Sequence, residues 1–352
     1  MTQAARGETF LAEIREQPQA LLRLIEQASV YEEAARAAVE RGPHIVRLVG
    51  HGSSDNAASY GVYAFGIASG WTALRDSISL SVYYGAKLEL ERSIVVALSQ
   101  SGRTPDVVAY VQRARDQGAL TIGITNEPKS ELAEAADLTL PLVAGPERAV
   151  AASKTYVNEL AALVLLASAV AGKTGEIVDQ LGAAAESMAE ALPRFEDAVA
   201  SVAGAFAYVG RMYVTGRGIE FATAREIALK LTETCRIAAE PLTSTDLAHG
   251  PVAALDPLFP VWTIASNDEA LPTIVEAARR AREAGAMLVA SGNAHSEIDG
   301  AAFHLPVPAA PSPLLAPLLS VVPGQLFAGA LALAKGLDSD HPTGLTKVTL
   351  AQ

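Results

Sequence analysis

Apolar positions along this chain follow two spacings, one typical of strands and the other typical of helices. Short apolar runs of strand type occupy residues 44–49, 78–82, 93–98, 120–124 and 138–142 in the first half. Four more occupy residues 212–215, 261–265, 287–291 and 303–307 in the second half. Helical patterns separate most of these runs, notably over residues 106–117 and from about residue 221. Strands that alternate with helices predict parallel sheets covered on both faces.

Three further regions are predicted to be mainly helical. The first covers about forty residues and ends at Gly42 and Pro43. The second runs over residues 155–202, with expected breaks at 172–175 and at Pro193. The third lies after residue 311, where we expect packed helices interrupted by prolines 313, 317 and 323.

A stretch of the first half is repeated in the second half. Residues 98–126 and 265–293 align without gaps at an offset of 167 and are identical at 9 of 29 positions. VGHG at 49–52 and TGRG at 215–218 lie at an offset of 166. We therefore predict an α/β protein with two tandem units, each a doubly wound, mainly parallel five-stranded sheet flanked by helices. A helical arm is expected over residues 1–30, the first unit over 31–200, and the second unit with a C-terminal tail over 201–352.

Composition narrows the class of protein. Half of the 352 residues are hydrophobic and 19% are charged, which allows sizeable cores. The net charge of −12 disfavours nucleic-acid binding, which needs clustered basic residues. The longest apolar run, at 160–171, is too short to span a membrane, and the first residues lack a signal-peptide pattern. A single cysteine, Cys235, excludes an intrachain disulfide framework and a cysteine-based zinc cluster. We expect a cytoplasmic protein without membrane or nucleic-acid partners.

A hydroxyl-rich loop follows the apolar run at 93–98. Its sequence is SQSGRT at 99–104, and Pro105 then opens a helix. A phosphate at this turn would meet free backbone N–H groups, a favourable helix dipole and the hydroxyls of Ser99, Ser101 and Thr104. Taken alone, the loop favours an ordinary Ser/Thr helix cap over a phosphate site.

A second donor-rich turn, GHGSS at 50–54, follows the run at 44–49. Both turns fall at carboxyl ends of predicted strands, where doubly wound sheets bind their ligands. The repeat differs at this point, because the second copy has Asp268 and Glu269 where the first copy has Ser101 and Gly102. Two carboxylates would repel a phosphate, so the anion site is expected in the first copy only.

The motifs GHGSS at 50–54, SQSGRT at 99–104 and VAASK at 150–154 together resemble a sugar isomerase (SIS) domain. The tandem arrangement resembles the isomerase half of the glutamine–fructose-6-phosphate aminotransferase family and, more closely, its deaminase and phosphosugar isomerase relatives. The resemblance covers nearly the whole chain. It implies that the sugar phosphate is bound by Gly52, Ser53, Ser54, Ser99, Gln100, Ser101, Thr104, Val150, Ala152 and Lys154.

Acid–base residues are expected in the second half. Glu226, Lys230 and Glu233 lie at i, i+4 and i+7 on one face of a predicted helix. Alone, such a row is typical of a solvated stripe of ion pairs, and His249 would be a structural histidine. The resemblance implies instead that Glu233 moves a proton between C1 and C2, with Glu226 and Lys230 in support. It also implies that His249 opens the sugar ring from the partner subunit of a homodimer, and that Lys347 lies near the open-chain carbonyl.

Departures from the family pattern favour one branch of it. The glutaminase reaction needs an N-terminal cysteine, whereas the only cysteine here is Cys235, so we expect no ammonia transfer from glutamine. Arg103 and Ala152 resemble the deaminase branch, whereas Thr343 stands where an arginine is common. We expect a glucosamine-6-phosphate deaminase without metal or cofactor, producing fructose 6-phosphate and ammonia. The alternatives are a phosphosugar isomerase without amine loss, a deglycase of phosphorylated sugar–amino acid adducts, and a phosphosugar-binding regulator.

Overall fold

The chain folds into two compact units, each built around its own sheet. The structure is a computed structural model, which describes residues 6–42 and 45–347. The N-terminal unit holds residues 17–147 and 154–183 and the described residues from 346 onward. The C-terminal unit holds the described residues up to 16, together with 148–153 and 184–345. Each unit therefore includes a segment from the opposite end of the chain.

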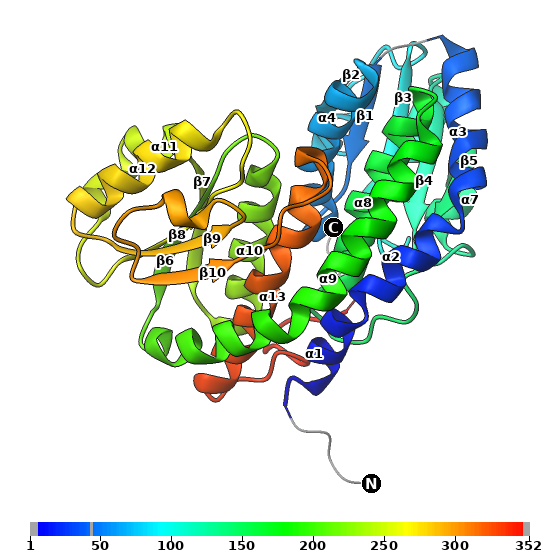
Figure 1. Ribbon diagram of the computed structural model, residues 1–352. Coiled ribbons are helices and arrows are strands. Elements are labelled where there is room, and N and C mark those ends of the chain that lie inside the picture. The colour runs from blue at the N-terminus through cyan, green and yellow to red at the C-terminus, as the bar shows by residue number, and fades with distance from the viewer. Residues whose placement is uncertain (1–5, 43–44, 348–352) are drawn as a thin grey trace, which may run out of the picture. The chain divides into compact units, whose positions relative to one another are not determined.

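The sheet of the N-terminal unit has five parallel strands in the order β2-β1-β3-β4-β5 (Figure 1). These strands are β1 (Ile45–Val49), β2 (Thr72–Arg75), β3 (Ser93–Leu98), β4 (Leu120–Thr125) and β5 (Leu138–Pro141). The order reverses between β1 and β3, which confirms the predicted doubly wound topology. The loops after β1 and β3 begin at this reversal, which is the usual place for a ligand in such a sheet.

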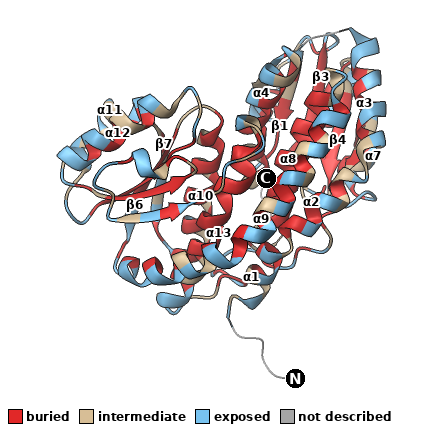
Figure 2. Ribbon diagram, viewed as in Figure 1, coloured by how far each residue is buried: buried red, intermediate tan, exposed pale blue. Residues whose placement is uncertain are grey.

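Helices cover both faces of this sheet. They are α2 (Gln17–Ile25), α3 (Ala28–Arg41), α4 (Ser53–Ser69), α5 (Ile78–Val82), α6 (Pro105–Asp116), α7 (Glu131–Ala135) and α8 (Lys154–Val170). Every residue of β3 is buried, and its Val95 and Ala97 pack with Val107 and Tyr110 of α6 in one apolar cluster. The α8 helix packs against α2, α3 and α4, and all its residues from Lys154 to Ser168 are buried. Figure 2 shows the exposed outer face of α3 in pale blue.

The C-terminal unit repeats the same topology, with five parallel strands in the order β10-β9-β8-β6-β7. The strands are β6 (Arg211–Gly216), β7 (Ala238–Thr243), β8 (Pro260–Ile264), β9 (Met287–Gly292) and β10 (Phe303–Pro306). The longer helices are α1 (Glu8–Arg15), α9 (Thr174–Ala203, which begins in the N-terminal unit), α10 (Glu220–Cys235), α12 (Leu271–Glu283) and α13 (Ala316–Ala334). The short α11 (Ser244–Ala248) follows β7. Both predicted sheets are therefore present, and the repeat in sequence is a repeat in structure.

An aromatic cluster forms much of the core of the C-terminal unit. The ring of Phe327 on α13 packs edge-on against Trp262 of β8 and Phe206, with centroids 5.0 and 5.3 Å apart. The Trp262 Nε1–H donates to Ser291 Oγ at 2.7 Å, so this buried indole has its polar group satisfied.

The N-terminal end of α1 is capped by a residue from the other end of the chain. Gly7, the N-cap, has no side chain to accept from the first helical N–H groups. The Asp340 carboxylate takes this role, accepting from Thr9 N at 3.1 Å and from Phe10 N at 2.7 Å. The packing of α1 against α13 places this contact within the C-terminal unit.

Two elements differ from the sequence-based expectation. The apolar run at residues 78–82, expected as a strand, is the short helix α5, in which the buried residues Ile78 and Ser81 are three positions apart. The strand beside β1 is instead β2, whose four residues are only partly buried or exposed and therefore lack an apolar signal. Strand β7 was also not expected, because Glu240 and Pro241 interrupt its sequence. It lies at the edge of the sheet, where a proline is tolerated.

Two prolines lie inside continuous helices, contrary to the expected breaks. Pro193 is within α9 and Pro323 is within α13. Pro193 is exposed, whereas its neighbours Leu192 and Phe195 are buried, so packing of the helix face outweighs the lost backbone hydrogen bond.

Among the described residues, one helix is long and apolar enough to cross a membrane. It is the segment Pro313–Ala334, with a mean hydropathy of 1.7, and 83% of that window is buried inside the fold. A core helix has the same length and composition, and this one carries the aromatic cluster of the C-terminal unit.

Candidate functional site

The hydroxyl-rich loop of the N-terminal unit is a tight turn between β3 and α6. Ser99 Oγ lies 3.1 Å from Thr104 Oγ1 and accepts from the Gly102 N–H at 3.1 Å. Gly102 has a φ of 63°, and a Cβ at this position would lie 1.9 Å from Ser130 Oγ. Only glycine therefore fits the turn. The loop gathers hydroxyls at the N-terminus of the twelve-residue helix α6, where the helix dipole favours an anion.

The loop after β1 lies against this turn. His51 Nε2 lies 3.6 Å from Asp106 Oδ2 in the first turn of α6, which joins the two predicted loops at the topological reversal. Gly52 takes a φ of 58° and a ψ of −127°, a conformation that essentially only glycine adopts. Ser53 then begins α4. The structure thus places the turns at 50–54 and 99–104 at the same end of the sheet, on the two strands between which the order reverses.

Ser54, also predicted to bind phosphate, makes a different contact. Its hydroxyl donates to Glu159 Oε1 at 2.7 Å, and both residues are buried. Because Glu159 is on α8, this bond ties the start of α4 to its neighbouring helix.

The remaining predicted binding residues are divided between the units. Val150 and Ala152 belong to the C-terminal unit, where the Val150 N–H donates to Asp340 O at 3.2 Å. Lys154 is buried at the start of α8 in the N-terminal unit.

Lys347, expected near the substrate carbonyl, is ion-paired within the N-terminal unit. Its Nζ lies 2.9 Å from Glu147 Oε2. The same carboxylate accepts from the Thr155 backbone N–H at 3.1 Å and from its hydroxyl at 2.7 Å. Glu147 therefore fixes both the first turn of α8 and the position of Lys347.

The position in the C-terminal unit that corresponds to Ser54 is occupied by a carboxylate. Glu220 stands at the 166-residue offset from Ser54, at the start of α10, and is buried. Its carboxylate accepts from Ser266 Oγ at 2.5 Å, Thr223 Oγ1 at 2.6 Å and Ser320 Oγ at 2.8 Å. Ser266 is the counterpart of Ser99 at the 167-residue offset. Burial raises the pKa of Glu220, although the three hydroxyl donors act in the opposite direction. In the second copy, the loop hydroxyl of Ser266 therefore already has a hydrogen-bond acceptor within the unit.

The predicted row on α10 is largely buried. Lys230 Nζ lies 3.4 Å from Glu226 Oε1 and 2.6 Å from Glu233 Oε2. The side chains of Glu226 and Lys230 are fully buried, whereas that of Glu233 is 23% exposed. The interpretation as a solvated stripe is therefore wrong. The row presents one carboxylate, held by a buried ammonium, to a cavity.

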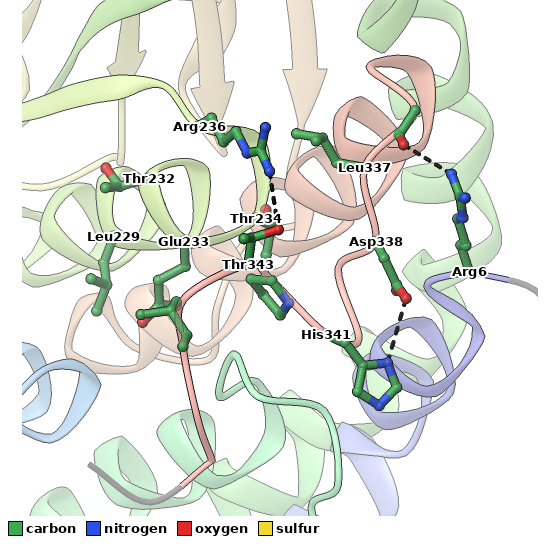
Figure 3. A pocket seen from close by; sticks show the side chains of 13 residues that line it. Arg6, Leu229, Thr232, Glu233, Thr234, Arg236, Leu337, Asp338, His341 and Thr343 are labelled. Carbon is green, nitrogen blue, oxygen red and sulfur yellow. Dashed lines mark hydrogen bonds and ion pairs between the residues drawn. The ribbon is translucent and has the colours of Figure 1, made fainter. Parts of the chain in front are cut away.

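This cavity, called the Glu233 cavity below, has a volume of about 620 Å³ and lies within the C-terminal unit (Figure 3). Its polar lining includes Arg6, Glu233, Arg236, Asp338, His341 and Thr343. A volume of this size is ordinary for a small-molecule site.

His249 is exposed and lies outside the Glu233 cavity. It is the C-cap residue of α11. It lines a separate pocket of about 420 Å³ with Thr273, Glu276 and Arg280 of α12. The described C-terminal unit therefore does not bring His249 and Glu233 into one pocket.

The chain is a tandem-domain α/β protein, built from two copies of one doubly wound unit. One copy has a hydroxyl-lined turn, and the other has a carboxylate that faces a cavity. The chain belongs to the SIS domain family, because the profile of that domain matches residues 42–169 and 206–335. The resemblance inferred from the sequence is confirmed.

Similar proteins are named for phosphosugar chemistry. The glutamine–fructose-6-phosphate aminotransferase of Aeropyrum pernix is 33% identical over 97% of this chain and 57% of its own length. The chain thus spans about half the length of the curated relatives it matches. A Silicibacter pomeroyi protein, provisionally assigned as a phosphosugar isomerase, has a structure with a TM-score of 0.83 at 32% identity, covering 94% of this chain and 99% of its own. The Thermotoga maritima glucosamine-6-phosphate deaminase shares the fold, with a TM-score of 0.76 at 22% identity, covering 98% and 100% of the two chains.

Sequence reasoning missed Arg236, Glu220 and Glu147. Arg236 follows the predicted row by three residues, so its place at the end of the same helix was the available signal. Glu220 and Glu147 gave none, because the contacts that set them apart, with Ser266 and Ser320 and with Lys347 respectively, join distant parts of the sequence.

Proposed function

We propose that the protein is a phosphosugar aldose–ketose isomerase with amine loss, converting glucosamine 6-phosphate and water to fructose 6-phosphate and ammonia. The observation that carries this proposal is the Glu233 carboxylate, held by buried Lys230 and open to a polar cavity. A carboxylate in this setting suits proton transfer between adjacent carbon atoms.

In this proposal the turn after β3 binds the substrate phosphate. Ser99, Ser101 and Thr104 supply hydroxyl donors, and the first turn of α6 supplies unpaired N–H groups. The second copy has no such role, because Glu220 already accepts the hydrogen bond from the equivalent Ser266.

The reaction proceeds in three balanced steps. The ring opens as the anomeric hydroxyl loses its proton and the ring oxygen gains one, which gives the aldehyde. Glu233 removes the C2 proton and returns it to C1, while the aldehyde oxygen gains a proton and the nitrogen loses one, so that C2 becomes an imine. Water adds to C2 and ammonia leaves, which gives the ketose.

His249 serves ring opening in this proposal, since imidazole both donates and accepts protons near neutral pH. Its separation from the Glu233 cavity within one C-terminal unit supports a supply from a second chain in a homodimer. Lys347 would act at the open-chain carbonyl after leaving Glu147.

The first test is turnover of glucosamine 6-phosphate, followed as release of ammonia and fructose 6-phosphate. Glu233→Gln should lower kcat by about 10²- to 10⁴-fold, the usual contribution of a general base, while phosphosugar binding persists. Glu283→Gln, an exposed glutamate paired with Arg279 in the same unit, is the matched control. Ammonia release from neither glucosamine nor galactosamine 6-phosphate would refute the deaminase, and unchanged turnover in Glu233→Gln would refute the role of the base.

A second test concerns the phosphate. Replacing Ser99, Ser101 and Thr104 by Ala, Ala and Val should weaken the binding of glucosamine 6-phosphate far more than that of glucosamine. Ser69→Ala is the control, since that hydroxyl is at the opposite end of α4 from the turn, where it donates to Phe65 O and accepts from the Trp71 N–H. Equal effects on the two ligands would contradict phosphate binding at this turn.

A third test distinguishes the two sources of His249. Mixing Glu233→Gln with His249→Asn chains creates heterodimers in which one site combines both intact residues, if the histidine comes from the partner. Random exchange should restore about one quarter of wild-type activity. No restoration would show that each chain uses its own His249 or none.

A further inference from the structure

Two histidine side chains face each other at one edge of the sheet in the C-terminal unit. The Nδ1 atom of His295 lies 3.1 Å from the Nδ1 atom of His304, and the two ring planes are inclined by 64°. His304 is on the edge strand β10, and His295 begins the short 3₁₀-helix η3 (His295–Glu297), which follows β9. No step of the proposed reaction uses either residue, and neither residue lines the Glu233 cavity.

The backbone around both histidines is fixed by hydrogen bonds. His304 is aligned with Ala290 of β9 in the parallel ladder. The Ala294 N–H, immediately before η3, donates to Ala265 O at 3.0 Å. The η3 segment contacts both β9 and β10. The two rings therefore meet between ordered segments, and a ligand that joins them would not have to order the backbone first.

The spacing of the two nitrogen atoms matches two ligands of one metal ion. Zinc binds imidazole nitrogen at about 2.0–2.1 Å, so nitrogens 3.1 Å apart would subtend an angle of about 100° at the ion. This angle is close to the angle between two ligands of a tetrahedral site. Imidazole suits Zn²⁺, Ni²⁺ and Cu²⁺, whereas Mg²⁺ and Ca²⁺ prefer oxygen ligands.

The protonation of the pair is compatible with ligation, which requires both Nδ1 atoms to be unprotonated. Without an ion, one neutral ring donates its Nδ1–H to the other ring, and ligation moves that proton through solvent to Nε2 of the same ring. Burial, and to a lesser extent the charge of His304, lower the pKa of His295, so protons compete weakly for this ring. His304 is exposed and His295 is partly exposed, which gives an ion access from solvent.

We propose that His295 and His304 together bind one divalent transition-metal ion of the kind that prefers imidazole, such as Zn²⁺, at a site separate from the proposed reaction. Among the residues that the structure describes, no third His, Cys, Asp or Glu completes a ligand group, so water occupies the remaining positions. The ion links η3 to β10. Because β10 has a neighbouring strand on one side only, this link stabilises the edge of the sheet.

The test is calorimetric titration with zinc chloride of wild type, His295→Gln, His304→Gln and the double variant. Glutamine keeps a polar side chain, but its amide oxygen is a poor ligand for Zn²⁺. Each single variant should weaken binding by about 10-fold or more, since even residues that only orient a metal ligand contribute about 10- to 100-fold. The two losses should not add, because either substitution alone removes the shared site.

Two controls separate binding at this pair from other effects. His341→Gln removes an exposed histidine that lies 3.4 Å from Asp338, and this variant should retain the affinity of the proposed site. In EDTA, every variant should have a Tm within about 2 °C of wild type, because exposed substitutions of this kind change stability little. Zinc should then raise the Tm of wild type and of His341→Gln, but not that of the double variant.

Three results would overturn the site. Equal zinc affinity in wild type and the double variant would show that the ion binds elsewhere on the surface. Losses that add would show that each histidine binds its own ion. Displacement of Zn²⁺ by an equal concentration of Mg²⁺ would indicate general attraction of cations rather than imidazole ligation. A non-additive loss confined to His295 and His304 would support the shared site.

Discussion

Replacing Glu220 tests whether the C-terminal unit depends on its internal carboxylate. Glu220→Ala leaves three buried hydroxyls, on Ser266, Thr223 and Ser320, without their acceptor. Each costs about 1–3 kcal/mol when unsatisfied, so the free energy of unfolding should fall by at least about 3 kcal/mol. Glu220→Gln should change it by no more than about 1 kcal/mol, because the amide can accept two bonds and donate the third.

The difference in stability between Glu220→Gln and wild type should also depend on pH. The raised folded-state pKa of Glu220 means that the folded chain binds the proton more tightly than the unfolded chain. The stability it contributes is complete below the ordinary value of 4.5 and is lost as pH rises through the folded-state pKa. The free energy of unfolding of Glu220→Gln should therefore increase relative to that of wild type as pH rises from 4.5.

The assay can follow the C-terminal unit separately. The chain has two tryptophans, and Trp262 is buried in the C-terminal unit while Trp71 is in the N-terminal unit. In a Trp71→Phe background, urea unfolding followed by fluorescence reports on Trp262 alone. The reasoning is refuted if Glu220→Gln costs as much as Glu220→Ala, or if its difference from wild type does not vary with pH.

Three other substitutions test the structure by urea unfolding. Gly102→Ala should cost more than about 2 kcal/mol, because the added Cβ meets the Ser130 side chain and φ is positive; Ser130→Gly in addition should restore part of the loss, and no loss would contradict the turn. Burial raises the pKa of Asp76, but hydrogen bonds including one from Tyr110 outweigh it and hold the pKa below its ordinary value. The stability from Asp76 is lost as pH falls through that lowered pKa, so Tyr110→Phe should cost more at pH 7 than at pH 3, and an equal cost would exclude the coupling. Pro193→Ala should raise the free energy of unfolding by about 1–3 kcal/mol by restoring a helical hydrogen bond, and a decrease would show that the proline suits its helix.

The sequence predicted the elements whose signal is local. Strand β3, its loop and α6 follow one another without interruption, so an apolar run, hydroxyl residues and Pro105 were sufficient to locate the turn. The row on α10 was predicted for the same reason, since helical periodicity alone places Glu233 beside Lys230. Its burial was not predicted, because that depends on the packing of α13 against α10.

Contacts between distant residues could not be predicted. Glu220 accepts from residues 46 and 100 positions further along the chain, and nothing in its neighbourhood marks it as buried. Arg236 adopts a glycine-like conformation that its identity does not indicate. Helix α5 was misassigned because a five-residue apolar run fits a strand or a helix equally well.

The cap of α1 has a consequence for synthesis of the chain. The helix leaves the ribosome well before the carboxylate that caps it, because that carboxylate is on Asp340, 330 residues after Phe10. The C-terminal unit cannot complete its packing until that residue has emerged, whereas most of the N-terminal unit is available by residue 183. The order of synthesis and the order of assembly therefore differ at α1, which remains uncapped until residue 340 has emerged.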